Sequence, residues 1–166
     1  MKNKFVIILP LLCLFFWGML VSGGNNGALD AKLNTAKADC KELLNGARYE
    51  GSKTTYFALR KDKQVKSVEV FMFMSNEYIF AIGGKVCSAP LTVKIYDADA
   101  DNKERILIKE FKKVEGSNLT FSSKDLNSAY LKKKSNADKL KNLFIEYHIG
   151  SGSPNTEGIV LVYGSK

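Results

Sequence analysis

The chain has 166 residues, and its 25 Lys and Arg outnumber its 17 Asp and Glu, which gives a formal net charge of +8. This length fits one domain. The nucleophile elbow G-x-S-x-G, the P-loop and the dinucleotide fingerprint G-x-G-x-x-G are all missing from the sequence. Their absence argues against the hydrolases and nucleotide-binding enzymes that these motifs mark.

The first 24 residues have the organisation of a secretory signal peptide. Lys2 and Lys4 precede an apolar run of 17 residues from Phe5 to Val21, and small and polar residues follow it. A charged start, an apolar centre and a small-residue exit predict cleavage after Gly23 or Gly24. The alternative is an uncleaved membrane anchor, for which such a run is at the short end of the usual range.

The chain beyond residues 1–24 is expected to be one exported domain, periplasmic, on the outer surface or secreted. It has 23 basic and 17 acidic residues, a net charge of +6. The charges alternate in sign except for basic clusters at 112–113 and 132–134. Such clusters can bind acidic glycans, lipid head groups or nucleic acid. Short charged runs are more often a solvated surface, and export argues against nucleic acid.

Two cysteines remain in residues 25–166, Cys40 and Cys87. In an oxidising compartment, an even pair predicts a disulfide. A loop of that length would stabilise the fold by about 4 kcal/mol in the chain-entropy account. The alternative is two buried free thiols, since Cys40 lies on an apolar helix face. Two cysteines and one histidine are too few for the usual four-ligand zinc site.

An amphipathic helix is predicted over residues 29–44. Its apolar side chains recur at spacings of four and three, which places them on one face: Leu29, Leu33, Ala36, Cys40, Leu43 and Ala47. Asp30 suits the first turn, where the helix dipole favours an acid, and Asn45-Gly46 is a stop signal. The stripe covers little more than two heptads, so we expect a helix packed on its own domain rather than a coiled coil.

Residues 68–97 are expected to form the centre of a β-sheet. In Val68–Met74 apolar residues occupy both faces, which predicts a strand covered on both sides. A short polar break and the alternating run Tyr78–Ile82 then predict an antiparallel hairpin with that strand. Leu91–Asp97 alternates cleanly, which predicts a strand with one solvated face.

The remaining strands are short and separated by turn signals, and we expect them at 54–60, 105–114, 119–122, 143–149 and 159–163. The Lys-, Ser- and Asn-rich segment 123–142 interrupts this pattern. It is expected to be an exposed excursion, in which Ser123 could cap a helix carrying Leu126 and Tyr130. About eight short strands predict a mainly β fold, an antiparallel, jelly-roll-like β-sandwich with the N-terminal amphipathic helix packed on it.

Asp97, Asp99 and Asp101 are the candidate metal ligands. An EF-hand would need Gly at the sixth position and Glu at the twelfth, where this chain has Asn102 and Ile108. A looser structural calcium site in a β-loop remains as a hypothesis, since oxygen-rich loops suit hard cations. The alternative is an ordinary turn rich in Asp and Asn. No other cofactor is expected.

His148 is the only histidine, and it lies near Glu146. A lone histidine can act as a general base, but no Ser or Cys nucleophile motif accompanies it. We therefore predict no catalytic residue and expect a protein that is not an enzyme. The seven tyrosines could stack on sugars from a sandwich face, or simply pack within the sheets.

Four runs carry a resemblance to a known group of proteins: CKELLNGARYEGSKTTYFALR, NEYIFAIGG, LTVKIYDADADNKE and GIVLVYG. Over most of residues 39–163 the chain resembles small exported bacterial β-sandwich proteins of uncharacterised function. These are similar to the pre-peptidase C-terminal and jelly-roll binding domains attached to secreted enzymes. The resemblance implies a sandwich and offers no catalytic residue, and the Lys-rich segment 123–142 departs from it.

The sequence therefore predicts an exported, non-catalytic β-sandwich that binds a cell-envelope or extracellular component, either a glycan or a protein. One alternative is a structural envelope subunit that acts by assembly, and another is a hydrolase that uses His148 and a nearby acid. Nucleic acid is not an expected partner. Membrane contact is expected only if residues 1–24 stay uncleaved. The ligand-binding residues and the oligomeric state are left open.

Overall fold

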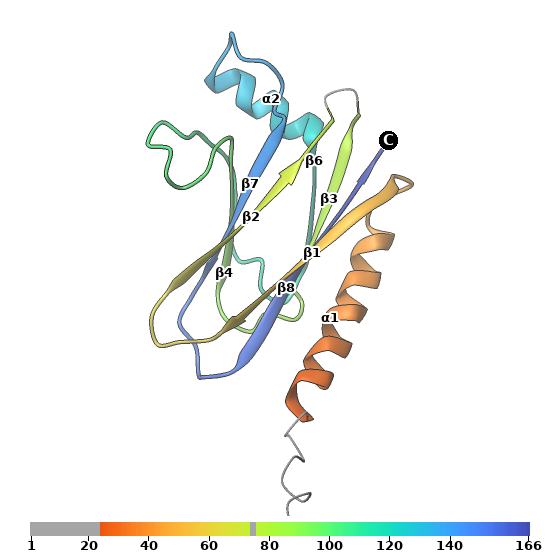
Figure 1. Ribbon diagram of the computed structural model, residues 1–166, viewed down its shortest axis with the longest axis vertical. Helices are drawn as coiled ribbons and strands as arrows, with labels where there is room; N and C mark the ends of the chain where they lie inside the picture. Colours follow the sequence, from red (N-terminus) through yellow and green to blue (C-terminus); the bar gives the residue numbers. More distant parts are fainter. Residues whose placement is uncertain (1–23, 74–75) are drawn as a thin grey trace, which may run out of the picture.

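The computed structural model describes residues 24–73 and 76–166, and in these ranges the protein is mainly β (Figure 1). Its elements, in chain order, are α1 Gly24–Glu42, β1 Arg48–Ala58, β2 Gln64–Phe71, β3 Tyr78–Gly83, β4 Leu91–Tyr96, β5 Leu107–Phe111, β6 Asn118–Ser122, α2 Ser123–Lys133, β7 Asn142–Ile149 and β8 Thr156–Ser165. The predicted signal peptide, apart from Gly24, lies outside the described residues.

The strands form two four-stranded antiparallel sheets, with the orders β1-β8-β3-β6 and β2-β7-β4-β5. The pairs β1–β8, β2–β7, β3–β6 and β4–β5 are the pairs of one long hairpin whose two arms have been rolled into a sandwich. This arrangement is a jelly roll. The predicted antiparallel β-sandwich of about eight strands is therefore confirmed.

The predicted hairpin between the strands near 68–74 and 78–82 is wrong. β2 pairs with β7 in one sheet, whereas β3 lies between β6 and β8 in the other. The chain therefore crosses from one sheet to the other between β2 and β3. A short polar break between two apolar strands has the same sequence pattern in a hairpin and in a crossing between sheets.

The main core lies between the two sheets. Alternate residues of each strand point inward, so β4 shows a regular alternation of buried and half-buried positions. The largest fully buried side chains include Phe80, Ile82, Leu91, Ile95, Leu143, Ile145, Tyr147, Ile149, Ile159 and Leu161. β8 is buried almost throughout because it has neighbouring strands on both edges and α1 on its outer face.

A second, smaller core lies between α1 and the outer face of the β1-β8-β3-β6 sheet. Leu33, Ala36, Cys40 and Leu44 pack there against Ala81, Val160 and Val162. Close approach depends on small residues, since a Cβ at Gly83 would lie 3.3 Å from Ala36 Cβ and from Cys40 Sγ. The predicted packing of the N-terminal helix on its own domain is confirmed. Among the described residues, no helix is long and apolar enough to cross a membrane.

The turn after α1 follows the stop signal in the sequence. Asn45 and Gly46 both have positive φ, at 50° and 81°. Such backbone angles are common for Asn and Gly and end a helix. α1 begins five residues before the predicted start, at Gly24.

α2 lies within the Lys-rich segment and crosses one end of the sandwich (Figure 1). Its N-cap is Ser122, whose side chain accepts a hydrogen bond from the backbone N–H of Asp125, so the predicted cap at Ser123 is one residue late. Ser123 is buried instead, and its hydroxyl accepts a hydrogen bond of 2.9 Å from the backbone N–H of Tyr78. This bond ties the start of α2 to the start of β3.

Candidate functional site

The outer face of the β2-β7-β4-β5 sheet, here called the open face, is the larger candidate surface. α1 covers the outer face of the other sheet, and α2 lies at one end of the sandwich, so neither described helix covers the open face (Figure 1). The side chains on this face follow from the strand register and lie in rows across the sheet: Phe71 and Asn142; Glu69, Phe144 and Tyr96; Ser67, Glu146 and Lys94; Val65, His148 and Thr92.

A fixed polar cluster occupies the middle of the open face. Glu146 has only 3% of its surface exposed. Its carboxylate accepts a hydrogen bond from the guanidinium of Arg105, and its Oε2 is hydrogen-bonded to Nε2 of His148 at 2.8 Å. The guanidinium of Arg105 also lies 4.0 Å from the ring centroid of Tyr96. Arg105 comes from the loop before β5 and reaches back over β4, so the cluster joins three parts of the sheet.

The electrostatics of this cluster favour an ionised Glu146. Burial would raise the pKa of the Glu146 carboxyl, but the hydrogen bonds from Arg105 and His148 outweigh burial and hold the pKa below its usual range. The hydrogen bond to Glu146 raises the pKa of Arg105. The result is a charged acceptor that is buried beneath its partners and a partly exposed charged donor, and their hydrogen bond holds both in place on the outer side of the sheet.

Exposed aromatic side chains lie along β2 and just beyond it. Phe71 and Phe73 have 69% and 76% of their surface exposed, and Val65 on the same face has 52%. The predicted strand covered on both sides is therefore wrong, because only one face of β2 packs into the core. The sequence did not reveal these functional candidates, because a strand with apolar residues on both faces is usually buried on both faces.

His148 has a carboxylate partner, as the alternative of a hydrolase would require. That partner, Glu146, is already paired with Arg105. No Ser, Thr or Cys side chain in the described ranges donates a hydrogen bond to His148. The arrangement can therefore orient and hydrogen-bond a polar ligand, and it lacks a placed nucleophile within the part of the chain that the structure describes.

The candidate calcium ligands are not gathered into a site. Asp97 Oδ1 accepts a hydrogen bond of 2.6 Å from the backbone N–H of Ile106, and Asp99 Oδ1 accepts from Asp101 and Asn102 at 3.1 and 3.0 Å. Across residues 24–73 and 76–166, no group of three or more His, Cys, Asp or Glu side chains could hold a metal ion. The carboxylates of Asp97 and Asp99 therefore shape the loop between β4 and β5 by accepting hydrogen bonds from backbone N–H groups.

The predicted Cys40–Cys87 disulfide is not formed, and the alternative of two buried free thiols is the arrangement seen. Cys40 belongs to the core between α1 and the sheet, whereas Cys87 belongs to the core between the two sheets. Burial raises the pKa of the Cys40 thiol to about 11 and that of Cys87 to about 12. Both thiols are therefore protonated and unreactive at neutral pH.

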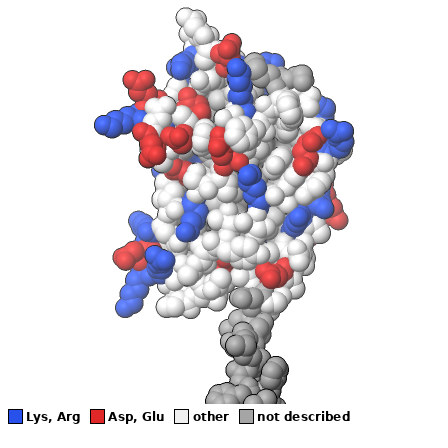
Figure 2. Space-filling model, in the orientation of Figure 1, with Lys and Arg blue, Asp and Glu red and all other residues white. Residues whose placement is uncertain are grey.

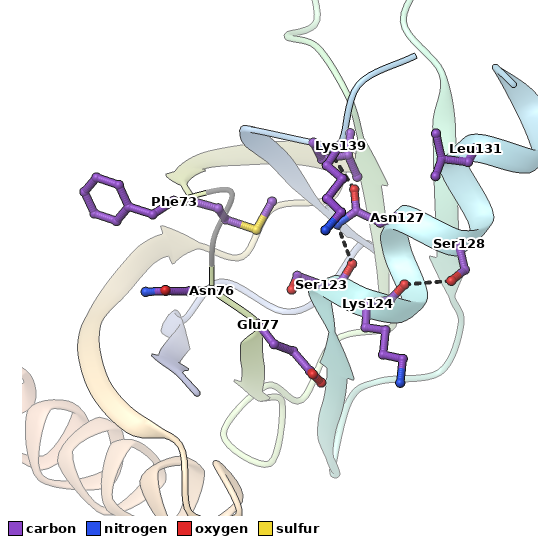
Figure 3. Close-up of a pocket in the computed structure, with 11 residues that line it drawn as sticks. Phe73, Asn76, Glu77, Ser123, Lys124, Asn127, Ser128, Leu131 and Lys139 are labelled. Atoms are coloured by element: carbon purple, nitrogen blue, oxygen red, sulfur yellow. Dashed lines mark hydrogen bonds between the residues drawn. The ribbon is translucent and has the colours of Figure 1, made fainter. Parts of the chain in front are cut away.

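A second candidate site is a pocket of about 440 Å³ beside α2, here called the α2 pocket (Figure 3). Residues just after β2, just before β3, in α2 and in the loop before β7 line it: Met72, Phe73, Asn76, Glu77, Ser123, Lys124, Asn127, Ser128, Leu131, Lys139 and Leu140. The ring of Phe73 points away from the other lining side chains in Figure 3 and is largely exposed. No residue of this pocket was predicted as a site from the sequence.

Comparisons with known proteins leave the family open. No protein-family model matches the chain, and no curated protein matches its sequence. Among solved structures, one similar chain comes from the Bacillus endospore appendages, described as a novel family of disulfide-linked pili. It is 10% identical with a TM-score of 0.35, and the match covers 74% of this chain and 92% of that one. A likeness this small carries no argument about function, and the resemblance to pre-peptidase C-terminal domains stays a prediction.

Proposed function

We propose that the protein is an exported, non-catalytic binding protein that recognises a cell-envelope or extracellular glycan on its open face. The observation that carries this proposal is the combination of two exposed rings, Phe71 on the open face and Phe73 just beyond β2, with the fixed Arg105–Glu146–His148 cluster on the same sheet. Sugar rings present an apolar C–H face that stacks on aromatic side chains, and their hydroxyl groups pair with charged donors and acceptors. Export is inferred from the predicted signal peptide.

The charge pattern favours a glycan over the other partners considered. Protein interfaces are depleted of charge at their centre, whereas the middle of the open face carries Glu146, Lys94 and Arg105. Figure 2 shows acidic and basic side chains mixed over the visible side of the molecule rather than gathered into one basic patch. A polyanion such as nucleic acid would need such a patch.

The test is sedimentation of the purified protein with insoluble purified peptidoglycan, chitin and cellulose. We expect at least one of these to retain the protein. The double variant Phe71→Ser/Phe73→Ser should weaken that retention roughly tenfold or more, because exposed aromatic anchors carry a large share of such binding. Leu43→Ser is the matched control, since it removes an exposed apolar side chain next to α1, away from the open face.

Two results of the sedimentation test would count against the proposal: no retention on any of the three polymers, or full retention of the double variant. Analytical ultracentrifugation distinguishes glycan binding from the alternative of assembly, because it measures whether the protein associates with itself. If the protein associates with itself and the double variant does not, the open face is an assembly surface and the glycan proposal is wrong.

A further inference from the structure

We propose that the α2 pocket binds a small organic anion with an apolar body, with a carboxylate paired to Lys139. This site is separate from the open face, and the proposal does not depend on glycan binding. Its volume of about 440 Å³ lies within the range of pockets that hold small organic molecules.

Part of the lining of the α2 pocket is apolar and buried. Met72 and Leu140 line it with only 8% and 6% of their surface exposed, and Leu131 is half-buried. These side chains come from the residue that follows β2, from the loop before β7 and from α2. An apolar body that enters the pocket therefore loses water on contact with side chains that are already largely dry.

Hydrogen bonds hold the pocket walls in place. The amide of Asn127 donates to the backbone C=O of Ser123 at 2.9 Å and accepts from the backbone N–H of Leu140 at 2.8 Å. Asn127 thereby fixes the loop that carries Lys139 against α2, and the bond between Ser123 and Tyr78 fixes α2 against β3. A site with fixed walls loses little conformational entropy when a ligand binds.

The charge of the pocket favours an anion. The described lining contains two lysines, Lys124 and Lys139, and one acid, Glu77, and Figure 3 shows Lys139 reaching from its loop toward the start of α2. In the described part of the chain, Lys139 has no acidic partner. The described lining includes no arginine, so the two-pronged hydrogen bonding that favours phosphate is missing. A singly charged carboxylate fits one ammonium group.

The experiment titrates the purified protein with hexanoate and benzoate, each against its neutral amide, hexanamide and benzamide, and follows backbone amide shifts by NMR. We expect the two carboxylates to shift the amides of α2 and Leu140 and to bind more tightly than their amides. Lys139→Gln should weaken carboxylate binding about fivefold and leave amide binding unchanged, as expected for one exposed ion pair. Lys132→Gln is the matched control, in the last turn of α2 and outside the pocket.

Each of the following results would overturn the proposal. They are equal binding of acid and amide, shifts that fall outside the residues lining the pocket, or equal weakening by Lys139→Gln and Lys132→Gln. Absence of any shift up to the solubility limit of the probes would also overturn it. Loss of polysaccharide binding by the open face would leave these outcomes unchanged, so the two proposals fail separately.

Discussion

One side chain in the core, Tyr147, destabilises the folded state through its hydroxyl group. The hydroxyl of Tyr147 is buried and has no hydrogen-bond partner within the described residues, and burial raises its pKa well above its usual value. An unpaired buried hydroxyl costs about 1–3 kcal/mol of desolvation free energy. The aromatic ring still fills the core, so Tyr147 is tolerated for its size.

Replacing Tyr147 by Phe should stabilise the protein. The substitution removes the unpaired hydroxyl and keeps the ring, so the free energy of unfolding should rise by about 1 kcal/mol. Urea unfolding measures this. Tyr78→Phe is the matched control and should destabilise instead, because the hydroxyl of Tyr78 accepts a hydrogen bond of 3.3 Å from the backbone N–H of Phe73. A loss of stability in the Tyr147 variant would contradict the expectation.

Glu146 should make the stability of the protein depend on acid. Its pKa is lower in the folded state than its ordinary value of 4.5. The ionised carboxylate therefore stabilises the fold above about pH 4.5, and this contribution disappears as the pH falls through the lower folded pKa. Glu146→Gln should be less stable than the natural protein at neutral pH, and the difference should shrink in acid.

Urea unfolding at neutral pH and near pH 3.5 tests this linkage. Glu110→Gln provides a control, since it removes a carboxylate from β5, at the edge of the same sheet, without touching Arg105 or His148. If the deficit of Glu146→Gln has the same size at both pH values, the carboxylate is not coupled to Arg105 and His148 as described.

At the scale of elements, sequence periodicity predicted what each segment forms better than where it pairs. β4 follows the predicted alternation, and the helix stripe from Leu33 to Cys40 packs as expected. The pairing of β2 was missed because turn residues mark a change of direction and do not indicate the sheet that receives the next strand. The exposure of Phe71 and Phe73 was missed for a related reason, since hydropathy alone does not show which face of a strand stays uncovered.

A charge placed between α1 and the sheet should detach α1 while the sandwich stays folded. Ala36 is 3% exposed and packs toward Gly83, so Ala36→Asp would bury a charge between α1 and the sheet. Peptide-resolved labelling with N-ethylmaleimide should then show faster reaction of Cys40, while Cys87 in the other core stays protected. Asn34→Asp, on the exposed side of α1, should change neither rate. Equal labelling of both cysteines would mean that the two cores unfold together.

At the scale of the whole molecule, the jelly roll depends on contacts between distant parts of the chain. Arg48 pairs with Ser165, and Gln64 pairs with Ile149, so these pairings join residues that lie far apart in the sequence. Propensity and periodicity describe neighbours within a few residues, and they cannot rank such pairings. For the same reason the sequence could not place Cys40 and Cys87 in different cores, or bring Met72 and Leu140 together in one pocket.

Reducing agents should leave the stability of the purified protein unchanged, because both thiols are free. A disulfide between Cys40 and Cys87 would contribute about 4 kcal/mol, which corresponds to a shift of roughly 10 °C in the unfolding midpoint. Thermal unfolding with and without dithiothreitol makes the comparison. A clear fall of the midpoint under reducing conditions would restore the disulfide predicted from sequence.

The end of β8 has a practical consequence for anyone who handles this protein. The backbone N–H of Lys166 donates a hydrogen bond of 2.8 Å to the backbone C=O of Glu77, and Glu77 lines the α2 pocket. α1 begins at the opposite end of the sandwich (Figure 1). A purification tag or sensor-chip tether attached after Lys166 would crowd the mouth of that pocket, whereas one attached ahead of α1 would leave the mouth accessible.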